Sequence, residues 1–431
     1  MKILITIALF TLSFFCYSEE LVTAKENINL SLKQAVELGL KNNLSLNKEK
    51  LNFKDREIEL YTIFNKFYPD LNLSSSLNIK PESSGISFSL SSGHSFNTKM
   101  IFEIIDTNIN YKIGKISFDQ ARTLLIKNIK KMYFKLVLQK KEISIKEKLL
   151  ENTKNRFNKA TIQFNQGEIS ELDKLNEELS YKTLLPEITK LKNDLQNNLN
   201  QFCFLIGLDF NNDIILTNEI PKLRNSNIPD KNKLNSDNNF DIDTLKLKIT
   251  KEENSKNILI SSLTPTIRLS YSLSLSSLKD IFKNNWGSEI EKEWSNNQNF
   301  SLSLSFPLHS TFPFSTNQVE ILKKDTSIKR AKIDLTNEIK KKEVEFLNLV
   351  LNLKQIDQTF DILDFNLKLS DKILKLTERS FNEGVKNLLD VKDAEKNLLD
   401  ANLKLEKAYF DYYDNYIELE YLIGLSKNQD L

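Results

Sequence analysis

Two acids spaced three residues apart, Asp390 and Asp393, are the side chains in this sequence that most suggest a functional site. That spacing puts both carboxylates on one face of a helix. Asp390 closes a capping box that begins at Asn387, because an acid at the third helical position bonds the backbone amide of the N-cap residue. Capping gives no reason for Asp393. We interpret the pair either as part of a carboxylate ring around the axis of an oligomer or as a solvated helix start.

A glycine precedes each of two such capping boxes in the chain. Gly384 comes before the box just described, and Gly167 comes before an earlier box that ends at Asp173. Glycine adopts the left-handed conformation that ends a helix, so both glycines predict turns between antiparallel helices. The position equivalent to Asp393 in the earlier copy is Asn176. The acid beyond the cap therefore belongs to the second copy alone.

The composition gives little support to catalytic or metal chemistry. The 431 residues include 2 His, 2 Cys, 9 Gly and 8 Pro, which leaves little material for a metal site, a nucleophilic dyad or a phosphate-binding loop. There is no Walker sequence and no Gly-x-Ser-x-Gly motif. His94 and His309 follow the second strand of each predicted strand pair, which indicates a shared structural position. We expect no enzymatic activity, no cofactor and no bound metal.

Charge and hydropathy exclude two further classes of protein. There are 60 Lys and Arg against 58 Asp and Glu, a net charge of +2, which does not suit a nucleic-acid-binding protein. Beyond the N-terminus no run of 18 apolar residues occurs, so a bundle of transmembrane helices is excluded. The few glycines and prolines instead favour long, uninterrupted elements.

The N-terminus has the pattern of a secretion signal. Lys2 is followed by an apolar stretch, and small residues stand before the expected cleavage point after Ser18, so residues 1–18 are interpreted as a signal peptide. Two alternatives are an uncleaved anchor, for which the stretch is short, and a lipid-modified Cys16. After cleavage Cys203 is the one remaining thiol, and its apolar neighbours predict a core position.

The rest of the chain is a tandem duplication. We predict a first repeat over residues 19–210, an Asn-rich linker over 211–239 and a second repeat over 240–431. Motifs near the end of each repeat recur at an offset of 217 positions, and those near its beginning recur at an offset of 196. The paired segments are 164–167 with 381–384, 205–208 with 422–425, and 68–71 with 264–267.

Each repeat is predicted to contain a helix, two strands, a long helix and a final helix. The strands, at about 71–79, 86–92, 266–277 and 300–306, alternate apolar residues with serine. This pattern fits a β-barrel wall, with the apolar side chains toward lipid and serine and Arg268 toward a wet lumen. A half-exposed sheet of a soluble protein alternates in the same way.

Four strands cannot close a barrel around a lumen, so several chains would have to contribute. Two chains would supply 8 strands and three would supply 12. The long helices, the first of them expected over 113–166, carry apolar stripes at steps of three and four residues, which is the coiled-coil period. They would form a second layer outside the membrane.

The chain resembles the TolC-like outer-membrane efflux family. The resemblance rests on the duplicated unit, on Pro69 and Pro265 before the first strand of each pair, and on the segment from Phe381 to Ala394, which contains an aromatic-x-x-Gly turn followed by Asp-x-x-Asp-Ala. It implies a mainly α-helical homotrimer with a 12-stranded barrel in the outer membrane and a coiled-coil tunnel in the periplasm. A periplasmic coiled-coil adaptor without its own pore is the alternative.

The resemblance also implies partners and roles for particular residues. The channel would receive drugs or other small molecules, with proteins as an alternative cargo, from an inner-membrane transporter through a periplasmic adaptor protein. Asp390 and Asp393 would form the pore constriction. Lys386 and Asp173 would link the two helix pairs in the closed state. Phe381 lacks the hydroxyl of the tyrosine that the best-known members have, so one hydrogen bond of the family pattern cannot form.

Overall fold

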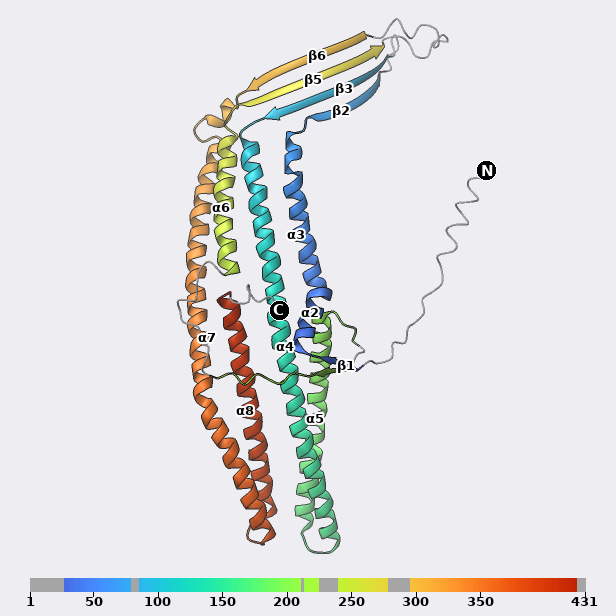
Figure 1. Ribbon diagram of the computed structural model, residues 1–431, viewed down its shortest axis with the longest axis vertical. Coiled ribbons are helices and arrows are strands. Elements are labelled where there is room, and N and C mark those ends of the chain that lie inside the picture. The colour runs from blue at the N-terminus through green and yellow to red at the C-terminus, as the bar shows by residue number, and fades with distance from the viewer. Residues whose placement is uncertain (1–26, 79–84, 211–212, 225–238, 278–294, 425–431) are drawn as a thin grey trace, which may run out of the picture. The chain divides into compact units, whose positions relative to one another are not determined.

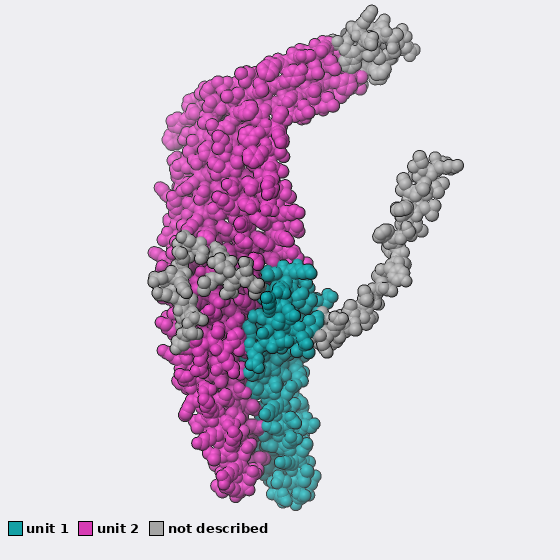
Figure 2. Space-filling view, viewed as in Figure 1, with its two compact units in different colours: residues 1–42, 132–219 teal, residues 43–131, 220–431 magenta. Residues whose placement is uncertain are grey.

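The computed structural model describes residues 27–78, 85–210, 213–224, 239–277 and 295–424. The expected signal peptide and most of the expected linker lie outside these residues. The chain divides into two compact units, one of residues 1–42 and 132–219 and the other of residues 43–131 and 220–431 (Figure 2). Among the described helices, none combines the length and the apolar character needed to cross a bilayer.

Unit 1 joins the N-terminal part of the chain to the first helical hairpin. It contains β1 (Asn27–Leu30), α2 (Leu32–Asn42), the C-terminal part of α4 (Lys99–Asn165), α5 (Glu171–Ile206) and β4 (Asp213–Leu216). β1 and β4 pair in parallel as a two-stranded sheet. β4 lies inside the segment that the sequence predicts to be a linker, so the beginning of that segment is part of a folded unit.

A fully buried tyrosine closes the end of this small sheet. The Tyr133 hydroxyl donates a hydrogen bond to the Leu30 carbonyl at 2.9 Å. The same hydroxyl oxygen accepts bonds from the backbone amides of Thr217 and Asn218, each at 3.1 Å. Because a buried hydroxyl without partners would be costly, this arrangement fixes both strands on α4.

The four predicted strands form one sheet in unit 2. β2 (Asp70–Asn78), β3 (Gly85–Phe96), β5 (Thr266–Ser277) and β6 (Ser295–Ser305) are antiparallel and lie in the order β2-β3-β5-β6 (Figure 1). β5 has the predicted bounds, whereas β3 extends to Phe96 and β6 begins at Ser295. The order brings the two strand pairs, far apart in sequence, into direct contact.

The register of the sheet separates apolar from hydroxyl-bearing side chains. Leu73, Leu90 and Leu273 are aligned on one face. The neighbouring positions on the other face are serines apart from Asn72, and hydroxyl pairs bond across strands at 2.6 to 2.7 Å, as between Ser74 and Ser89. Successive strand residues point to opposite sides, so the alternation in the sequence becomes two chemically distinct surfaces.

The helices of the two repeats correspond in length and position. α4 and α7 (Thr316–Asn382) each contain 67 residues, and their starts are separated by the 217 positions found in the sequence. α5 corresponds in the same way to α8 (Leu388–Leu422). α4 begins at Lys99, not at the expected Ile113. The internal duplication is thus visible in the fold.

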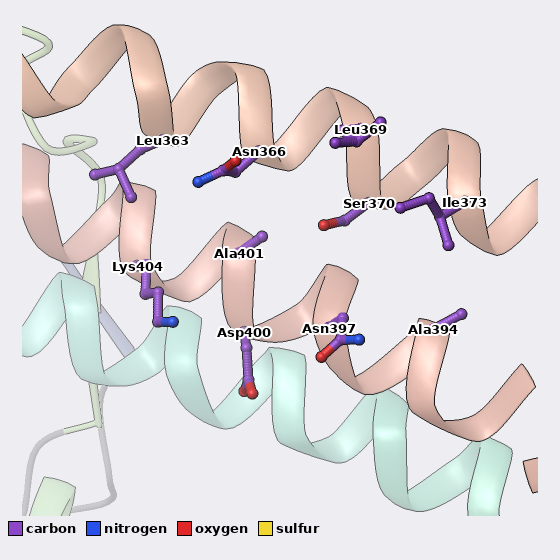
Figure 3. Close-up of a pocket in the computed structure, with 10 residues that line it drawn as sticks. All are labelled: Leu363, Asn366, Leu369, Ser370, Ile373, Ala394, Asn397, Asp400, Ala401 and Lys404. Atoms are coloured by element: carbon purple, nitrogen blue, oxygen red, sulfur yellow. The ribbon is translucent and has the colours of Figure 1, made fainter. Parts of the chain in front are cut away.

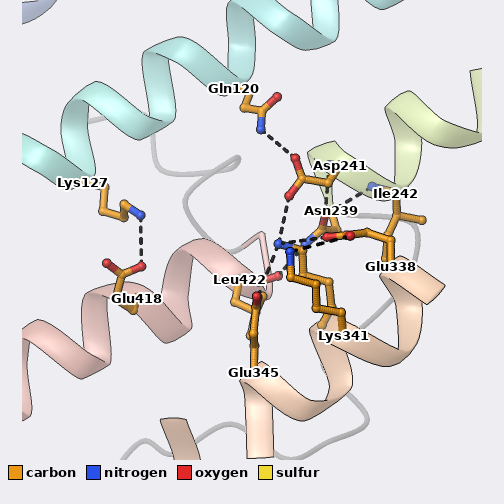
Figure 4. Close-up of polar contacts among 11 residues, drawn as sticks. Gln120, Lys127, Asn239, Asp241, Ile242, Glu338, Lys341, Glu345, Glu418 and Leu422 are labelled. Carbon is orange, nitrogen blue, oxygen red and sulfur yellow. Dashed lines mark hydrogen bonds and ion pairs between the residues drawn. The ribbon is translucent and has the colours of Figure 1, made fainter. Parts of the chain in front are cut away.

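The remaining helices of unit 2 are shorter. α3 (Leu44–Thr62) continues into a 3-10 turn over Ile63–Phe67, and α6 (Phe240–Ser261) precedes the second strand pair. Asn239 joins α6 to α8, because its side-chain oxygen accepts from the Asp241 and Ile242 amides while its side-chain nitrogen donates to the Leu422 carbonyl at 3.2 Å (Figure 4). The two shorter helices of the second repeat therefore meet end to end along α7.

Candidate functional site

Both predicted glycine turns adopt the backbone conformation that glycine favours. Gly167 has φ of 78° and Gly384 has φ of 75°. In the second turn the Gly384 amide donates to the Phe381 carbonyl and the Val385 amide donates to the Ser380 carbonyl, each at 2.9 Å. A Cβ atom on either glycine would meet nothing within 4 Å. The constraint on these positions is therefore the left-handed backbone and not a lack of space.

The predicted capping boxes are confirmed at the helix starts that follow. The Asp390 amide donates to the Asn387 side chain at 2.9 Å, and the Asn387 amide donates to the Asp390 carboxylate at 3.2 Å. At the start of α5 the Ser170 hydroxyl bonds the Asp173 carboxylate at 2.6 Å, and both backbone bonds of the box are present. Asp173 and Asp390 thus have defined local roles.

The two acids of the proposed constriction differ in their surroundings. Asp390 is engaged twice, in the capping box and in an ion pair of 3.6 Å with Lys386 Nζ. Asp393 is exposed and forms no hydrogen bond or ion pair with any residue that the structure describes. Of the two carboxylates, Asp393 is the one available to a ligand or a neighbouring copy.

The predicted closing link is not formed within either unit. Lys386 belongs to unit 2 and pairs with Asp390, whereas Asp173 belongs to unit 1 and bonds Ser170. Phe381 is exposed near the second turn. The link between Lys386 and Asp173 stays a prediction.

A buried ion pair distinguishes the first hairpin from the second. Arg156 Nε of α4 lies 3.6 Å from Glu177 Oε2 of α5, and the two side chains are 12% and 10% exposed. Arg156 also donates to the Thr153 hydroxyl at 2.9 Å. The equivalent positions in the second repeat, at the 217 offset, are Ile373 and Ala394, which cannot form such a pair.

The second hairpin has a groove at these equivalent positions. Ile373 and Ala394 lie on opposite walls of a hollow of about 300 Å³ between α7 and α8 (Figure 3). Polar side chains, including Asn366, Asn397 and Lys404, line the same hollow. Aligning the repeats and comparing charged with apolar positions would have revealed this difference from sequence.

A polar network joins the helices of unit 2 around the α6–α8 junction. Lys342 Nζ lies 2.9 Å from Asp241. Asp241 also accepts a hydrogen bond from Gln120 at 2.9 Å (Figure 4). Burial is the largest influence and disfavours charge on both partners, but their mutual hydrogen bond and the attraction of neighbouring opposite charges together outweigh it. The pKa of Asp241 is therefore lowered and the pKa of Lys342 is raised. Lys127 and Glu418, 3.0 Å apart, extend the network between α4 and α8.

Residues 220–224 form a short extended segment that crosses α7 and α8. Ile220 is buried. Lys222 lies over the Tyr409 ring, and the Arg224 guanidinium lies 5.4 Å from the centre of the Phe360 ring and 3.0 Å from Asp361. Every second residue of this segment, at positions 220, 222 and 224, therefore faces the hairpin formed by α7 and α8. Their cation–π contacts were not expected from the sequence, which places this segment in a linker.

The comparisons with known proteins agree with this geometry. Residues 234–425 match the sequence model of the family described as outer membrane efflux protein. No curated protein matches the chain in sequence. The resemblance to the TolC-like outer-membrane efflux family is confirmed, most directly over the second repeat.

Three solved structures illustrate the similarity of fold. The Campylobacter jejuni CmeC outer membrane channel is 16% identical with a TM-score of 0.79, and the alignment covers 93% of this chain and 87% of that chain. The outer membrane protein VceC of Vibrio cholerae is 13% identical with a TM-score of 0.74 over 91% and 96% of the two chains. The Neisseria gonorrhoeae MtrE outer membrane channel is 17% identical with a TM-score of 0.73 over 91% and 88%.

These likenesses confirm the predicted fold class. They extend over more than nine tenths of the chain, so the likeness of fold includes the first repeat, which lies outside the family match. The family and the similar structures are efflux proteins and channels and not enzymes.

Proposed function

We infer that this protein, which has the sequence signature of the outer membrane efflux family over residues 234–425 and the fold of an outer membrane channel over most of its length, is the channel component of an export system. It would conduct solutes across the outer membrane through the barrel and across the periplasm through the helices. We propose that drugs or other small molecules are the cargo, with proteins as the alternative.

The observation that carries this proposal is the sheet with two unlike faces. Large apolar side chains on one face are exposed in the single chain; Leu73 and Leu302, for example, are 79% and 70% exposed. Small hydroxyl and amide side chains make up most of the other face. Water cannot be the partner of the first face and lipid cannot be the partner of the second, so the sheet suits a wall between bilayer and lumen.

The open edges of the sheet support a homotrimer. β2 and β6 are the outer strands of the described sheet, and each has one unpaired side. Unpaired strand edges are not tolerated in lipid, so β6 of one copy must pair with β2 of the next. Three copies would close a 12-stranded barrel. Under this proposal the Asp390 and Asp393 carboxylates of the three copies surround the periplasmic end of the tunnel.

The other partners follow from the proposed role. The family supplies outer membrane components for tripartite systems, which supports a periplasmic adaptor protein and an inner-membrane transporter as partners. The helices would lie in the periplasm and the sheet in the outer membrane. We also propose that Lys386 and Asp173 hold the tunnel closed, an exposed link worth about 0–1 kcal/mol and therefore easily released.

One experiment on the detergent-purified protein tests the proposal. We expect a particle with three copies of the 50.0 kDa chain that forms discrete conductance steps in a planar bilayer. A trimer without conductance would favour the adaptor alternative. A monomer without conductance would overturn the proposed function altogether.

A further inference from the structure

The polar face of the sheet carries almost no charge. Its positions are set by the register, which runs without interruption through all three strand pairings. In the described strands this face holds serine, threonine, asparagine or glycine at every position except two. The exceptions are Asp70 at the beginning of β2 and Arg268 near the beginning of β5. Within the described strands this face therefore has one cationic side chain, and apart from Asp70 its neighbours are neutral hydroxyl and amide groups.

Arg268 is free to bind a solute. Its side chain is exposed and forms no hydrogen bond or ion pair with the residues that the structure describes. The guanidinium extends over the neighbouring strand at Gly93, where a Cβ atom would lie 3.7 Å from Arg268 Nη2. The absence of a side chain at Gly93 leaves room for the guanidinium to lie close to the strand, while the Arg268 side chain stays exposed.

Hydroxyl groups flank the guanidinium on both neighbouring strands. The register places Ser95 of β3 and Ser303 of β6 beside Arg268. A guanidinium presents a planar set of donors that matches the oxygens of a phosphate or carboxylate group, and adjacent hydroxyls can donate to the same group. The three side chains together have the donor set of an anion site.

One acid lies near this cluster without neutralising it. Asp70 is aligned with Gly93 across β2 and β3, on the same face as Arg268. Asp70 is exposed and has no ion pair with Arg268 within the described sheet. Its charge weakens the local positive potential but leaves the guanidinium donors unoccupied.

We propose that Arg268 forms an anion-selecting ring at the helix-side mouth of the barrel, where it binds phosphate or carboxylate groups of passing solutes. The proposal rests on the trimeric channel proposed above, in which the three copies supply three guanidinium groups facing one lumen. Rings of arginine or lysine select anions, as rings of acids select cations. The channel would thus carry opposite charges in series, acids at the tunnel end and arginines at the barrel mouth.

Reversal potentials in a planar bilayer under a KCl gradient test this assignment. We expect Arg268→Ser to shift the potential toward cation preference, both in the otherwise unchanged protein and in the Asp390→Asn, Asp393→Asn background. Arg268→Lys is the matched control and should keep the original potential, because it preserves the charge. The difference in reversal potential between Arg268→Ser and the unaltered protein should shrink as the salt concentration rises, since the Debye length falls from about 10 Å at 0.1 M to about 3 Å at 1 M.

Inorganic phosphate supplies an independent probe. Millimolar phosphate should reduce the chloride current of channels that have Arg268, and Arg268→Ser should abolish that block. If Arg268→Ser does not assemble, Arg268→Gln serves in its place, since its neutral amide preserves more of the side chain's length.

The outcomes separate this inference from the proposed function. Trimers that conduct with equal selectivity with and without Arg268, and show no block by phosphate, would overturn the anion ring and leave the channel intact. If the unaltered protein forms no conductance at all, the proposed channel fails and the ring fails with it.

Discussion

At the residue scale, the two acids after the second turn have unequal freedom. Asp390 is held by the Asn387 cap and by Lys386, whereas Asp393 is exposed without a partner among the described residues. In the proposed trimer six carboxylates, two from each copy, approach one axis. Asp393 should then contribute more to selectivity than Asp390, because Lys386 already offsets the charge of Asp390.

We expect Asp390→Asn with Asp393→Asn to remove the cation preference and the block by divalent or trivalent cations. The trimer should persist, because asparagine has nearly the same size. Single-channel recordings with potassium chloride, and then with added divalent cation, measure both effects. Asp393→Asn alone should reproduce most of the change and Asp390→Asn alone a smaller part.

Unchanged selectivity and block in the double variant would show that the two aspartates only start the helix. In that case their benefit would be confined to capping and to the favourable charge at the helix N-terminus, worth about 0.3–1 kcal/mol for an exposed acid.

At the element scale, the sheet offers adjacent positions that test its two faces. Ser301 and Leu302 follow each other on β6 and point to opposite sides. We expect Leu302→Arg to reduce the yield of trimer in the outer membrane, since an arginine on the lipid face costs up to about 2–4 kcal/mol. Ser301→Arg is the matched control and should assemble with altered conductance. Equal assembly of the two variants would contradict the assignment of faces.

The two helical hairpins differ in how they are stabilised. Arg156→Leu should lower the melting temperature, because it leaves Glu177 buried without its charge partner, a loss of about 3–5 kcal/mol in comparable cases. The combination Arg156→Ile with Glu177→Ala installs the residues of the second repeat and should restore most of the lost stability. Melting temperatures measured by circular dichroism distinguish the single variant from the double variant. A double variant as unstable as the single one would show that the pair itself is required.

At the scale of the whole molecule, α7 has an apolar stripe that is exposed among the described residues. Phe346, Leu353 and Phe360 are buried, whereas Leu351 and Phe365 are each 63% exposed. The exposed residues recur at steps suited to a coiled coil. In the proposed trimer this stripe would face neighbouring copies.

We expect Leu351→Lys with Phe365→Lys to reduce the trimer fraction, because the change buries charge in the proposed interface between copies. The control is Asn352→Lys with Thr359→Lys, which adds the same charge at polar positions of the same helix roughly a quarter turn or more away from Leu351 and Phe365. Mass measurement in detergent gives the trimer fraction, and helical content by circular dichroism should stay equal. If Leu351→Lys with Phe365→Lys leaves the trimer fraction unchanged, the interface between copies does not include this stripe.

The sequence by itself determined the features that depend on local chemistry. The serine alternation defines the two faces of the strands, because side chains alternate along any extended chain. Gly167, Gly384 and the capping boxes end and begin helices through their own backbone and side-chain bonds. The tandem motifs made the correspondence of α4 with α7 visible without coordinates.

The tertiary structure alone decided the features that join distant segments. Residues 99–112 contain several Ile, Asn and Thr, which are modest helix formers, yet α4 includes them, as Asn254 of α6 donates to the Phe102 carbonyl at 2.8 Å. The pairing of β4 with β1 is likewise a contact between segments far apart in sequence.

The same limit applies to the candidate sites. The spacing of Asp390 and Asp393 is visible in the sequence, but their unequal engagement depends on where Lys386 points. Arg268 is identified by sequence as a residue of the polar face. That its exposed side chain lies close to Gly93 follows from the pairing of β3 with β5, two strands from different repeats. Local patterns determine the chemistry of each side chain and the face of the helix or strand on which it lies. The partners that complete a site come from long-range contacts that no short pattern encodes.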